Sequence, residues 1–265
     1  MSKVYHLDLD RKMLQGATLA LLPGDPFRSP KIAAALSEQT GAKGIELSWK
    51  REYRSFLCGS RGKRILVTST GIGGPSTSIA IDELARLGVR TFIRVGTSGA
   101  IQPGIEVGDL VITTGAVRLD GASTHYAPIE FPAVAHPQVL FALIEAAGLH
   151  RKRQGIRYHV GVTASSDTFY PGEERSDGFS RYIIRRLRGI TDELKNLHVL
   201  NYEMEAATLL TLCAAMGLKG GVITGIVNRR TRKGEMRITP ERLRAGEENV
   251  IKVALSAAER LVSGS

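Results

Sequence analysis

The sequence has few cysteines and no long hydrophobic run. Only two cysteines, Cys58 and Cys213, occur among its 265 residues. They fall in segments that read as a strand and a buried helix, which favours reduced core thiols over a disulfide framework. No apolar stretch approaches the ~20 residues that a transmembrane helix needs, and Met1 to Asp8 lacks the apolar core of a signal peptide. These absences predict a soluble, cytoplasmic protein that does not insert into a membrane.

Several catalytic signatures are missing as well. The segment Thr70–Ser76 has glycines between a predicted strand and a predicted helix, but their spacing does not fit a dinucleotide-binding turn. No Gly-Lys-Ser/Thr forms a P-loop, no His/Cys spacing indicates zinc, and no Gly-x-Ser-x-Gly elbow indicates a serine hydrolase. The motifs of these cofactor-binding, metal-binding and serine-hydrolase classes are therefore missing from the sequence.

What the chain does have is an excess of positive charge. The formal net charge is +10, concentrated in Arg151–Arg153, Arg185–Arg188 and Arg229–Lys233. Nucleic-acid binding is one interpretation of such clusters, and a steep salt dependence would support it. The clusters are not interleaved with aromatic residues and no nucleic-acid-binding motif accompanies them. The sequence therefore favours a solvated basic surface from which a few arginines bind a small anion.

Strand-like and helix-like segments alternate from Ala17 to the C-terminus, which is typical of an α/β protein with helices on both faces of a sheet. No linker or compositional break divides the chain, so we predict a single domain over residues 1–265 with three αβα layers. The expected strands are 18–22, 53–58, 64–70, 91–95, 110–114, 158–164, 198–200 and 221–227. The expected helices are 30–39, 77–87, 138–147, 178–187, 203–216 and 242–261.

Glycines and arginines follow two predicted strands, where α/β proteins bind ligands. Bare backbone at Gly24 and the forked guanidinium of Arg28 suit phosphate oxygens, although a tight turn with a surface arginine explains them equally. Arg94 stands inside an otherwise apolar strand before the loop expected at 96–99. An unpaired buried guanidinium costs several kcal/mol, so Arg94 requires an anion, either a structural carboxylate or a substrate phosphate. We favour phosphate, because the adjacent loop also offers backbone N–H groups and hydroxyls to an anion.

Glu203 and Glu205 stand at the start of a predicted buried helix. A carboxylate in a first helical turn is stabilised by free N–H groups and by the helix dipole, so either could be a simple cap. Residues at i and i+2 do not face each other on a helix, however, and one cap needs only one carboxylate. The second is therefore available to hold the hydroxyls of a substrate.

These segments together resemble uridine phosphorylases, within the nucleoside phosphorylase family. The resemblance covers nearly the whole chain. It implies an αβα fold with a mixed, partly barrel-like sheet, and reversible phosphorolysis of a nucleoside to free base and ribose 1-phosphate. Inorganic phosphate is then a co-substrate, and no covalent enzyme intermediate forms. It also implies a hexamer, a trimer of dimers whose active sites are shared between neighbours. The segments that carry it are 14–18, 23–26, 69–79, 94–103, 117–123, 130–135, 161–172 and 201–210.

The resemblance also assigns roles to residues. Implied phosphate ligands are Gly24, Arg28, Arg94 and Thr97, with Arg51 supplied by a neighbouring subunit. Implied ribose contacts are Thr97, Met204 and Glu205, with His6 from the neighbour, while Glu203 serves mainly at the helix start. Arg28, Arg94 and Glu205 would be the catalytic residues. Implied base contacts are Phe169, Glu173, Arg175 and Arg229. A monovalent cation such as potassium would be held at the dimer interface by Glu52, Ile72 and Ser76.

The pattern departs from the family at Glu173, where uridine phosphorylases have glutamine. An ionised carboxylate accepts hydrogen bonds only and would repel uracil O2, whereas the N1–H and 2-amino groups of guanine suit it. Val227-Asn228-Arg229 nevertheless matches the pyrimidine enzymes, because hexameric purine enzymes have aspartate there. We therefore expect uridine first and a 6-oxopurine nucleoside second. A hydrolytic nucleosidase is a further alternative, but water as nucleophile needs no arginine cradle.

Overall fold

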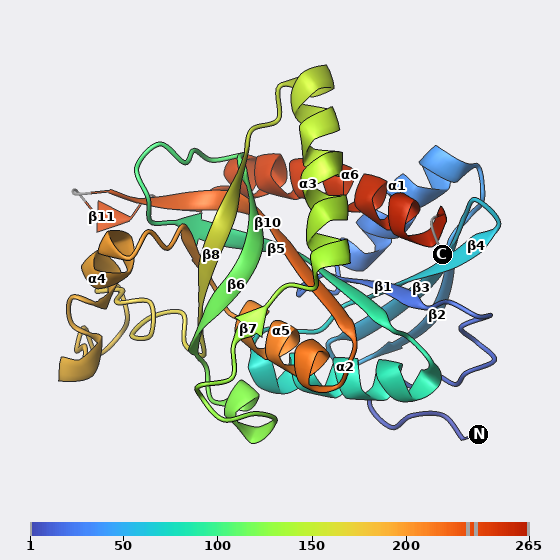
Figure 1. The fold of residues 1–265 in the computed structure, drawn as a ribbon, viewed down its shortest axis with the longest axis horizontal. Coiled ribbons are helices and arrows are strands. Elements are labelled where there is room, and N and C mark those ends of the chain that lie inside the picture. The colour runs from blue at the N-terminus through green and yellow to red at the C-terminus, as the bar shows by residue number, and fades with distance from the viewer. Residues whose placement is uncertain (1, 232–233, 236–237, 264–265) are drawn as a thin grey trace.

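The strands of the chain form one mixed sheet, seen in a computed structural model that describes residues 2–231, 234–235 and 238–263 (Figure 1). The strand order is β11-β10-β6-β8-β9-β5-β1-β4-β3-β2, and β7 pairs with β6. Because β10 also pairs with β5, the strands β10, β6, β8, β9 and β5 close into a barrel-like ring. The strands are β1 (Leu19–Leu22), β2 (Ile45–Lys50), β3 (Tyr53–Ser60), β4 (Lys63–Thr68), β5 (Thr91–Ala100), β6 (Leu110–Leu119), β7 (Ala133–Val134), β8 (Tyr158–Ser166), β9 (Asn201–Glu203), β10 (Lys219–Thr231) and β11 (Gly234–Glu235).

Helices cover both faces of this sheet (Figure 1). One layer contains α1 (Arg28–Thr40), α3 (Pro137–Gln154) and α6 (Pro240–Ser263). The other contains α2 (Gly74–Leu87) and α5 (Ala206–Ala215), while the short α4 (Ile190–Asn196) lies to one side. The three layers confirm the predicted αβα class.

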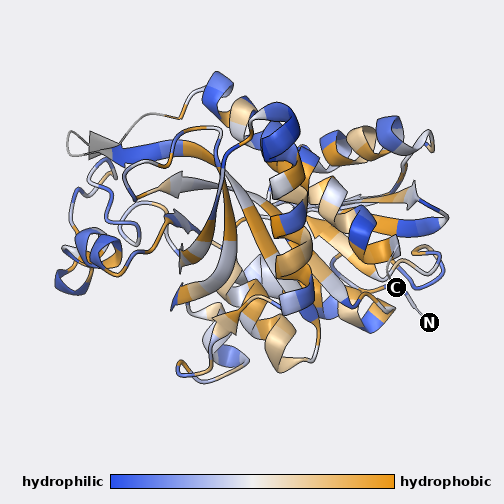
Figure 2. Ribbon diagram, turned by 45° about the horizontal axis from the view of Figure 1, so that its top comes forward, coloured by the Kyte–Doolittle hydropathy of each residue, from blue (hydrophilic) through white to orange (hydrophobic). Residues whose placement is uncertain are grey.

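The alternation of side chains along the strands separates the two largest clusters of core residues. In β5, Phe92 packs on the side of α2 and α5, whereas the adjacent Ile93 packs on the side of α1, α3 and α6. Val222 and Ile223 of β10 divide in the same way, as the period of two along a strand requires. Burying each such side chain contributes about 1.5–3 kcal/mol. Figure 2 shows hydrophobic residues along the central strands and hydrophilic ones on the outer parts of the helices.

The predicted helix 178–187 is wrong. Only Arg185–Leu187 in this segment forms a 3-10 turn, and α4 begins after it. Arg181 has a left-handed φ of 52°, and the aromatic residues Phe179 and Tyr182 are exposed rather than aligned on a buried face. Without an apolar stripe to bury, the segment has no reason to form a stable helix.

Two other boundaries differ from the expectation in ways that affect the site. The predicted loop 96–99 is strand, because β5 continues to Ala100 beside β10 and β9. The predicted strand 198–200 begins later, as β9 (Asn201–Glu203), and α5 starts at Ala206 rather than at Glu203. Among the described residues, no helix combines the length and the apolar character needed to cross a membrane.

Candidate active site

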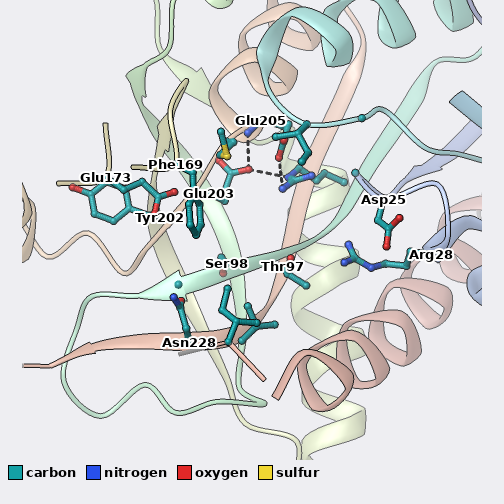
Figure 3. A pocket seen from close by; sticks show the side chains of 18 of the residues that line it. Asp25, Arg28, Thr97, Ser98, Phe169, Glu173, Tyr202, Glu203, Glu205 and Asn228 are labelled. Carbon is teal, nitrogen blue, oxygen red and sulfur yellow. Dashed lines mark hydrogen bonds and ion pairs between the residues drawn. The ribbon is translucent and has the colours of Figure 1, made fainter. Parts of the chain in front are cut away.

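A cavity of about 570 Å³ lies at the carboxyl ends of the parallel strands β1, β4, β5 and β10. Ligands of open α/β sheets bind at this edge, because the loops that follow parallel strands meet there. Figure 3 shows Arg28 and Asp25 towards one end of the cavity and Phe169, Glu173 and Tyr202 towards the other. The lining residues are Gly24, Asp25, Pro26, Arg28, Glu52, Gly71, Ile72, Arg94, Thr97, Ser98, Gly99, Phe169, Glu173, Tyr202, Glu203, Met204, Glu205, Val227, Asn228 and Ile238.

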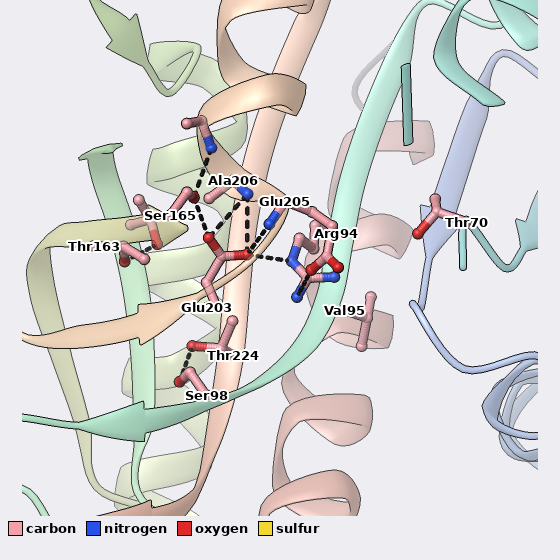
Figure 4. A network of polar contacts seen from close by, with 12 residues as sticks. Thr70, Arg94, Val95, Ser98, Thr163, Ser165, Glu203, Glu205, Ala206 and Thr224 are labelled. Atoms are coloured by element: carbon pink, nitrogen blue, oxygen red, sulfur yellow. Dashed lines mark hydrogen bonds and ion pairs between the residues drawn. The ribbon is translucent and has the colours of Figure 1, made fainter. Parts of the chain in front are cut away.

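Arg94 is a buried cation in the wall of this cavity (Figure 4). Its Nε donates to Glu203 Oε2 at 2.8 Å, and its Nη2 forms an ion pair with Glu205. Its guanidinium packs on Gly96, where an added Cβ would lie 2.8 Å from both Cζ and Nη2. The anions that pair with Arg94 are therefore two carboxylates, the alternative that the sequence favoured less, and Arg94 also lines the cavity.

Glu203 connects Arg94 to the start of helix α5. Its carboxylate accepts hydrogen bonds from the backbone N–H groups of Glu205, at 2.9 Å, and of Ala206. It also accepts from the hydroxyl of Ser165 on β8. Glu203 thus satisfies free N–H donors at the helix start, as predicted, although it lies in a strand.

Glu205 is oriented differently from Glu203, towards the loop before helix α2. It accepts from Gly73 N–H at 2.5 Å and pairs with Arg94. Gly73 has a left-handed φ of 91°, which glycine adopts without strain. Burial raises the pKa of the Glu205 carboxyl above its ordinary value, and the charge of Glu203 adds to this, whereas the charge of Arg94 opposes it. Because the Glu205 carboxylate is shielded from water, hydrogen bonds and charges of the protein must stabilise it.

Backbone from the loop after β1 approaches Arg94. A Cβ on Gly24 would lie 3.2 Å from Gly71 O and 3.8 Å from Arg94 Nη1. Gly71 N–H donates to Gly24 O at 3.0 Å, so the loop after β1 is paired to the loop after β4. Thr97 of β5 lines the same cavity. Gly24, Arg94 and Thr97 are thus brought together in an arrangement that can hold an anion.

Arg28 also lines the cavity, and its main partner was not foreseen from the sequence. Its Nε and Nη2 donate to Glu247 Oε1 on α6 at 3.0 and 2.9 Å, and Nη1 donates to Val95 O at 3.3 Å. The exposed Lys31 donates to the other oxygen of Glu247 at 2.7 Å. Nothing local in the sequence pointed to Glu247, because it stands 219 residues after Arg28.

The segment between β8 and α4 contributes Phe169 and Glu173 to the far end of the cavity. Phe169 lines the cavity, and the guanidinium of Arg175 lies over its ring at 4.2 Å. Glu173 is buried, with Arg230 Nη2 at 3.5 Å from its Oε2. Arg230 also lies over the ring of Tyr202 at 4.7 Å. The sequence interpretation missed Arg230, since the arginine run at the end of β10 offered no means of ranking its members.

Two of the predicted base contacts have other partners. Arg175 donates to Asp177 through Nε and Nη2, and Arg229 forms an ion pair with Glu106. Neither is among the lining residues, whereas Asn228 is. A Cβ on Gly99 would lie 2.3 Å from Asn228 Oδ1, so only glycine leaves room for the Asn228 amide at this position. The base-contact roles of Arg175 and Arg229 stay predictions.

His6 and Arg51 lie outside the lining of this chain's cavity. Both were predicted to act in a neighbouring subunit. His6 Nδ1 is 2.8 Å from Glu83 Oε1, and Glu83 also accepts from the backbone N–H groups of His6 and Leu7. Arg51 is exposed, with a left-handed φ of 55° in the turn between β2 and β3. Glu83 therefore anchors the segment that presents His6.

The residues predicted to bind a cation converge around Gly71. A Cβ added there would lie 2.7 Å from Glu52 Cγ and 3.2 Å from Ser76 Oγ. Ser76 Oγ also donates to Ile72 O at 3.2 Å. One carboxylate, one hydroxyl and one carbonyl provide the oxygen ligands that a hard cation prefers.

Comparisons with known sequences show which family the chain belongs to. The model of the Phosphorylase superfamily matches residues 18–263. A uridine phosphorylase of Escherichia coli is 51% identical over 98% of this chain and 99% of its own length. One from Thermococcus kodakarensis is 47% identical over 92% of this chain and 82% of its own length. A guanosine phosphorylase of Halorubrum lacusprofundi is 33% identical over 92% of this chain and 93% of its own length. With one family model matched along almost the whole sheet and both helical layers, the chain belongs to the Phosphorylase superfamily.

Proposed function

We propose that this chain catalyses the reversible phosphorolysis of uridine to uracil and ribose 1-phosphate, with no covalent enzyme intermediate. The observation that carries the proposal is the bridge from Arg94 to Glu203 and Glu205 in the cavity wall. A cation beside a carboxylate supports the binding of phosphate next to the hydroxyls of a sugar. The relatives named as uridine phosphorylases support the choice of nucleoside.

The proposed reaction needs positioning and charge stabilisation rather than a nucleophilic side chain. Phosphate attacks C1′ as the bond to the base breaks, so positive charge grows on the sugar and negative charge on the leaving base. Arg28, Arg94 and Thr97 hold the phosphate beside C1′, with the backbone at Gly24 approaching its oxygens. Glu205 accepts hydrogen bonds from the ribose 2′ and 3′ hydroxyls, while Met204 packs beside the sugar.

The base is bound at the end of the cavity that contains Phe169 and Glu173. Arg230 offsets the charge of Glu173, because the two side chains lie 3.5 Å apart in a buried site. This pairing weakens the repulsion that an isolated Glu173 would exert on uracil O2, so it favours uridine. A 6-oxopurine nucleoside is the second candidate substrate, because Glu173 can accept from its N1–H and 2-amino groups.

The complete site is proposed to need a second copy of the chain. His6 and Arg51 stand outside the cavity of their own subunit. An exposed aromatic side chain lies beside each of them, because Tyr5 packs edge-on against His6 and the Trp49 indole N–H donates to Arg51 O. Phe27 packs edge-on against Trp49 at 5.8 Å, yet both rings are at least half exposed. Such a patch suits burial against another copy, in a dimer and then in a hexamer of three dimers.

A monovalent cation, such as potassium, would bind at Glu52, Ile72 and Ser76 on the same face. It would neutralise the carboxylate of Glu52 beside the cavity and brace the loop before α2. No other cofactor is proposed. A cytoplasmic location and a single domain over residues 1–265 are also part of the proposal.

Base release from uridine, thymidine, inosine and guanosine, measured with and without phosphate, tests the function. We expect release that requires phosphate and is fastest with uridine. Release without phosphate would indicate a hydrolytic nucleosidase, and preference for guanosine would move the assignment to a 6-oxopurine enzyme. Salt-sensitive binding to nucleic acid without any base release would remove the proposal altogether.

A further inference from the structure

The partner of Arg28 points to a residue role beyond the phosphate ligands themselves. Arg28 and Glu247 are both about 95% buried, at 5% and 4% exposure. A buried guanidinium and a buried carboxylate that pair so closely hold each other in one geometry, since losing either partner leaves an uncompensated charge. Glu247 therefore restricts the orientation of Arg28 more strongly than a surface ion pair would.

The pattern of contacts leaves a defined part of Arg28 for a ligand. A guanidinium has five N–H groups. Glu247 accepts from Nε and from one Nη2 N–H, and Val95 O accepts from one Nη1 N–H, so these contacts use three of them. The remaining two, one on each terminal nitrogen, can donate to phosphate oxygens. Arg28 is thus a cavity-lining group with one edge fixed and one edge available.

Helix α6 is held in place immediately before Glu247. Gly246 packs directly on β10, where a Cβ added to Gly225 would lie 2.1 Å from Gly246 O. A Cβ on Gly246 would in turn lie 2.8 Å from Val227 Cγ1. Only glycine at both positions permits this approach of helix backbone to strand backbone. The contact brings Glu247 from the C-terminal helix to the Arg28 end of the cavity.

We propose that Glu247 is a positioning residue that orients Arg28 for phosphate, an inference that rests on the proposed phosphorolysis. Glu247 itself is not a cavity-lining residue, so it acts through Arg28 rather than on the substrate. Lys31 steadies the second carboxylate oxygen from the solvent side. The C-terminal helix thereby takes part in phosphate affinity although it contributes no ligand.

Steady-state kinetics of Glu247→Gln test this role. The amide keeps the shape of the side chain but loses the charge that binds Arg28. The KM for phosphate should rise about tenfold or more, while the KM for uridine changes by less than about threefold. An unchanged phosphate KM would overturn the inference, as would equal rises in both KM values.

A double-mutant cycle with Arg28→Lys separates positioning from general structural damage. Lysine cannot make the paired contact, so adding Glu247→Gln to Arg28→Lys should change phosphate KM by less than about twofold. If Glu247→Gln raises the phosphate KM as much in the Arg28→Lys variant as in the native protein, the proposal is contradicted. Asp109→Asn is the matched control, because Asp109 is also buried and paired with an arginine, Arg157, but lies outside the cavity lining. Its phosphate KM should stay native.

Glu247→Asp provides a second variant should the glutamine variant not fold. It keeps the charge but withdraws the carboxylate by one methylene, so the same selective rise in phosphate KM is expected. A native phosphate KM in a folded Glu247→Asp would count against the positioning role. If the native protein releases base without phosphate, the proposed function itself fails, and that outcome is distinguishable from failure of the Glu247 role.

Discussion

The two ends of the cavity differ in how their side chains are supported. At the Arg28 end, charged groups come from strands and helices and hold one another in buried pairs, such as Arg94 with Glu203 and Arg28 with Glu247. At the Phe169 end, Phe169 and Glu173 come from an irregular segment between β8 and α4 that leaves Phe179 exposed, although Tyr202 and Asn228 come from strands. Loops tolerate change, whereas breaking a buried charge pair is costly. Under the proposed function, the phosphate and sugar contacts therefore come from regular elements, and part of the base pocket comes from a segment that tolerates change.

Arg94→Met should give the largest effect. It removes the proposed phosphate ligand and leaves Glu203 and Glu205 buried without their cation. We expect kcat/KM to fall roughly 10²–10³-fold and the free energy of unfolding to fall by about 3–5 kcal/mol. Kinetics and denaturant unfolding at fixed protein concentration measure both. Near-native kcat/KM would show that this end of the cavity does not bind the reacting groups.

Gly96→Ala should have a smaller effect on the same end. The new Cβ would lie 2.8 Å from Arg94 Cζ, and the paired carboxylates prevent the guanidinium from moving away. Overpacking of this kind costs about 1–3 kcal/mol, so phosphate KM should rise about tenfold. Gly148→Ala is the control, since its Cβ would only reach ordinary contact, 3.7 Å from the hydroxyl of Tyr158. Equal kinetics for the two variants would mean that Arg94 is not held as tightly as its contacts indicate.

Glu173→Gln changes the other end of the cavity. The amide can donate to uracil O2 and accept from N3–H, so uridine kcat/KM should rise several-fold, up to about tenfold. Phosphate KM should stay constant if the two ends are independent. Kinetics with uridine and guanosine at varied phosphate measure both quantities. Unchanged uridine kinetics would refute the assigned role of Glu173, and a changed phosphate KM would refute the separation of the two ends.

Asp109→Asn should leave catalysis unchanged and alter only stability. Burial tends to raise the pKa of Asp109, but hydrogen bonds from Arg157, the Glu106 N–H and His159 outweigh it, so the pKa lies below its ordinary value. A carboxyl with a lowered folded pKa stabilises the fold above its unfolded pKa of about 3.9 and loses this effect as pH falls through the folded value. At pH 7 the unfolding free energy of the variant should be about 1–3 kcal/mol lower than that of the native protein. This difference should become smaller below about pH 4. A difference in unfolding free energy that does not depend on pH would contradict the inference that ionised Asp109 stabilises the fold.

More of the contacts at the Arg28 end of the cavity could be predicted from the sequence than of those at the Phe169 end. An arginine in an apolar strand and two carboxylates before an apolar helix are strong local signals, because buried charge always needs a partner. The segment 178–187 misled the prediction, since helix-compatible residues without a buried face do not form a lasting helix. Arg230 was missed because several adjacent arginines are equivalent until the direction of β10 is known.

The sequence by itself determined the residue types of the site, the αβα class and the need of Arg94 for an anion. Tertiary structure alone decided which carboxylates meet which arginines. Arg28 and Glu247 are 219 residues apart, and they meet only because Gly225 and Gly246 let α6 approach β10. Similarly, β10 closes the ring by pairing with β5, so the loops of distant strands share one cavity. The local sequence shows which buried charged side chains need a partner. The packing of distant elements decides which partner each one meets, because an ion pair depends on the distance between two side chains in space.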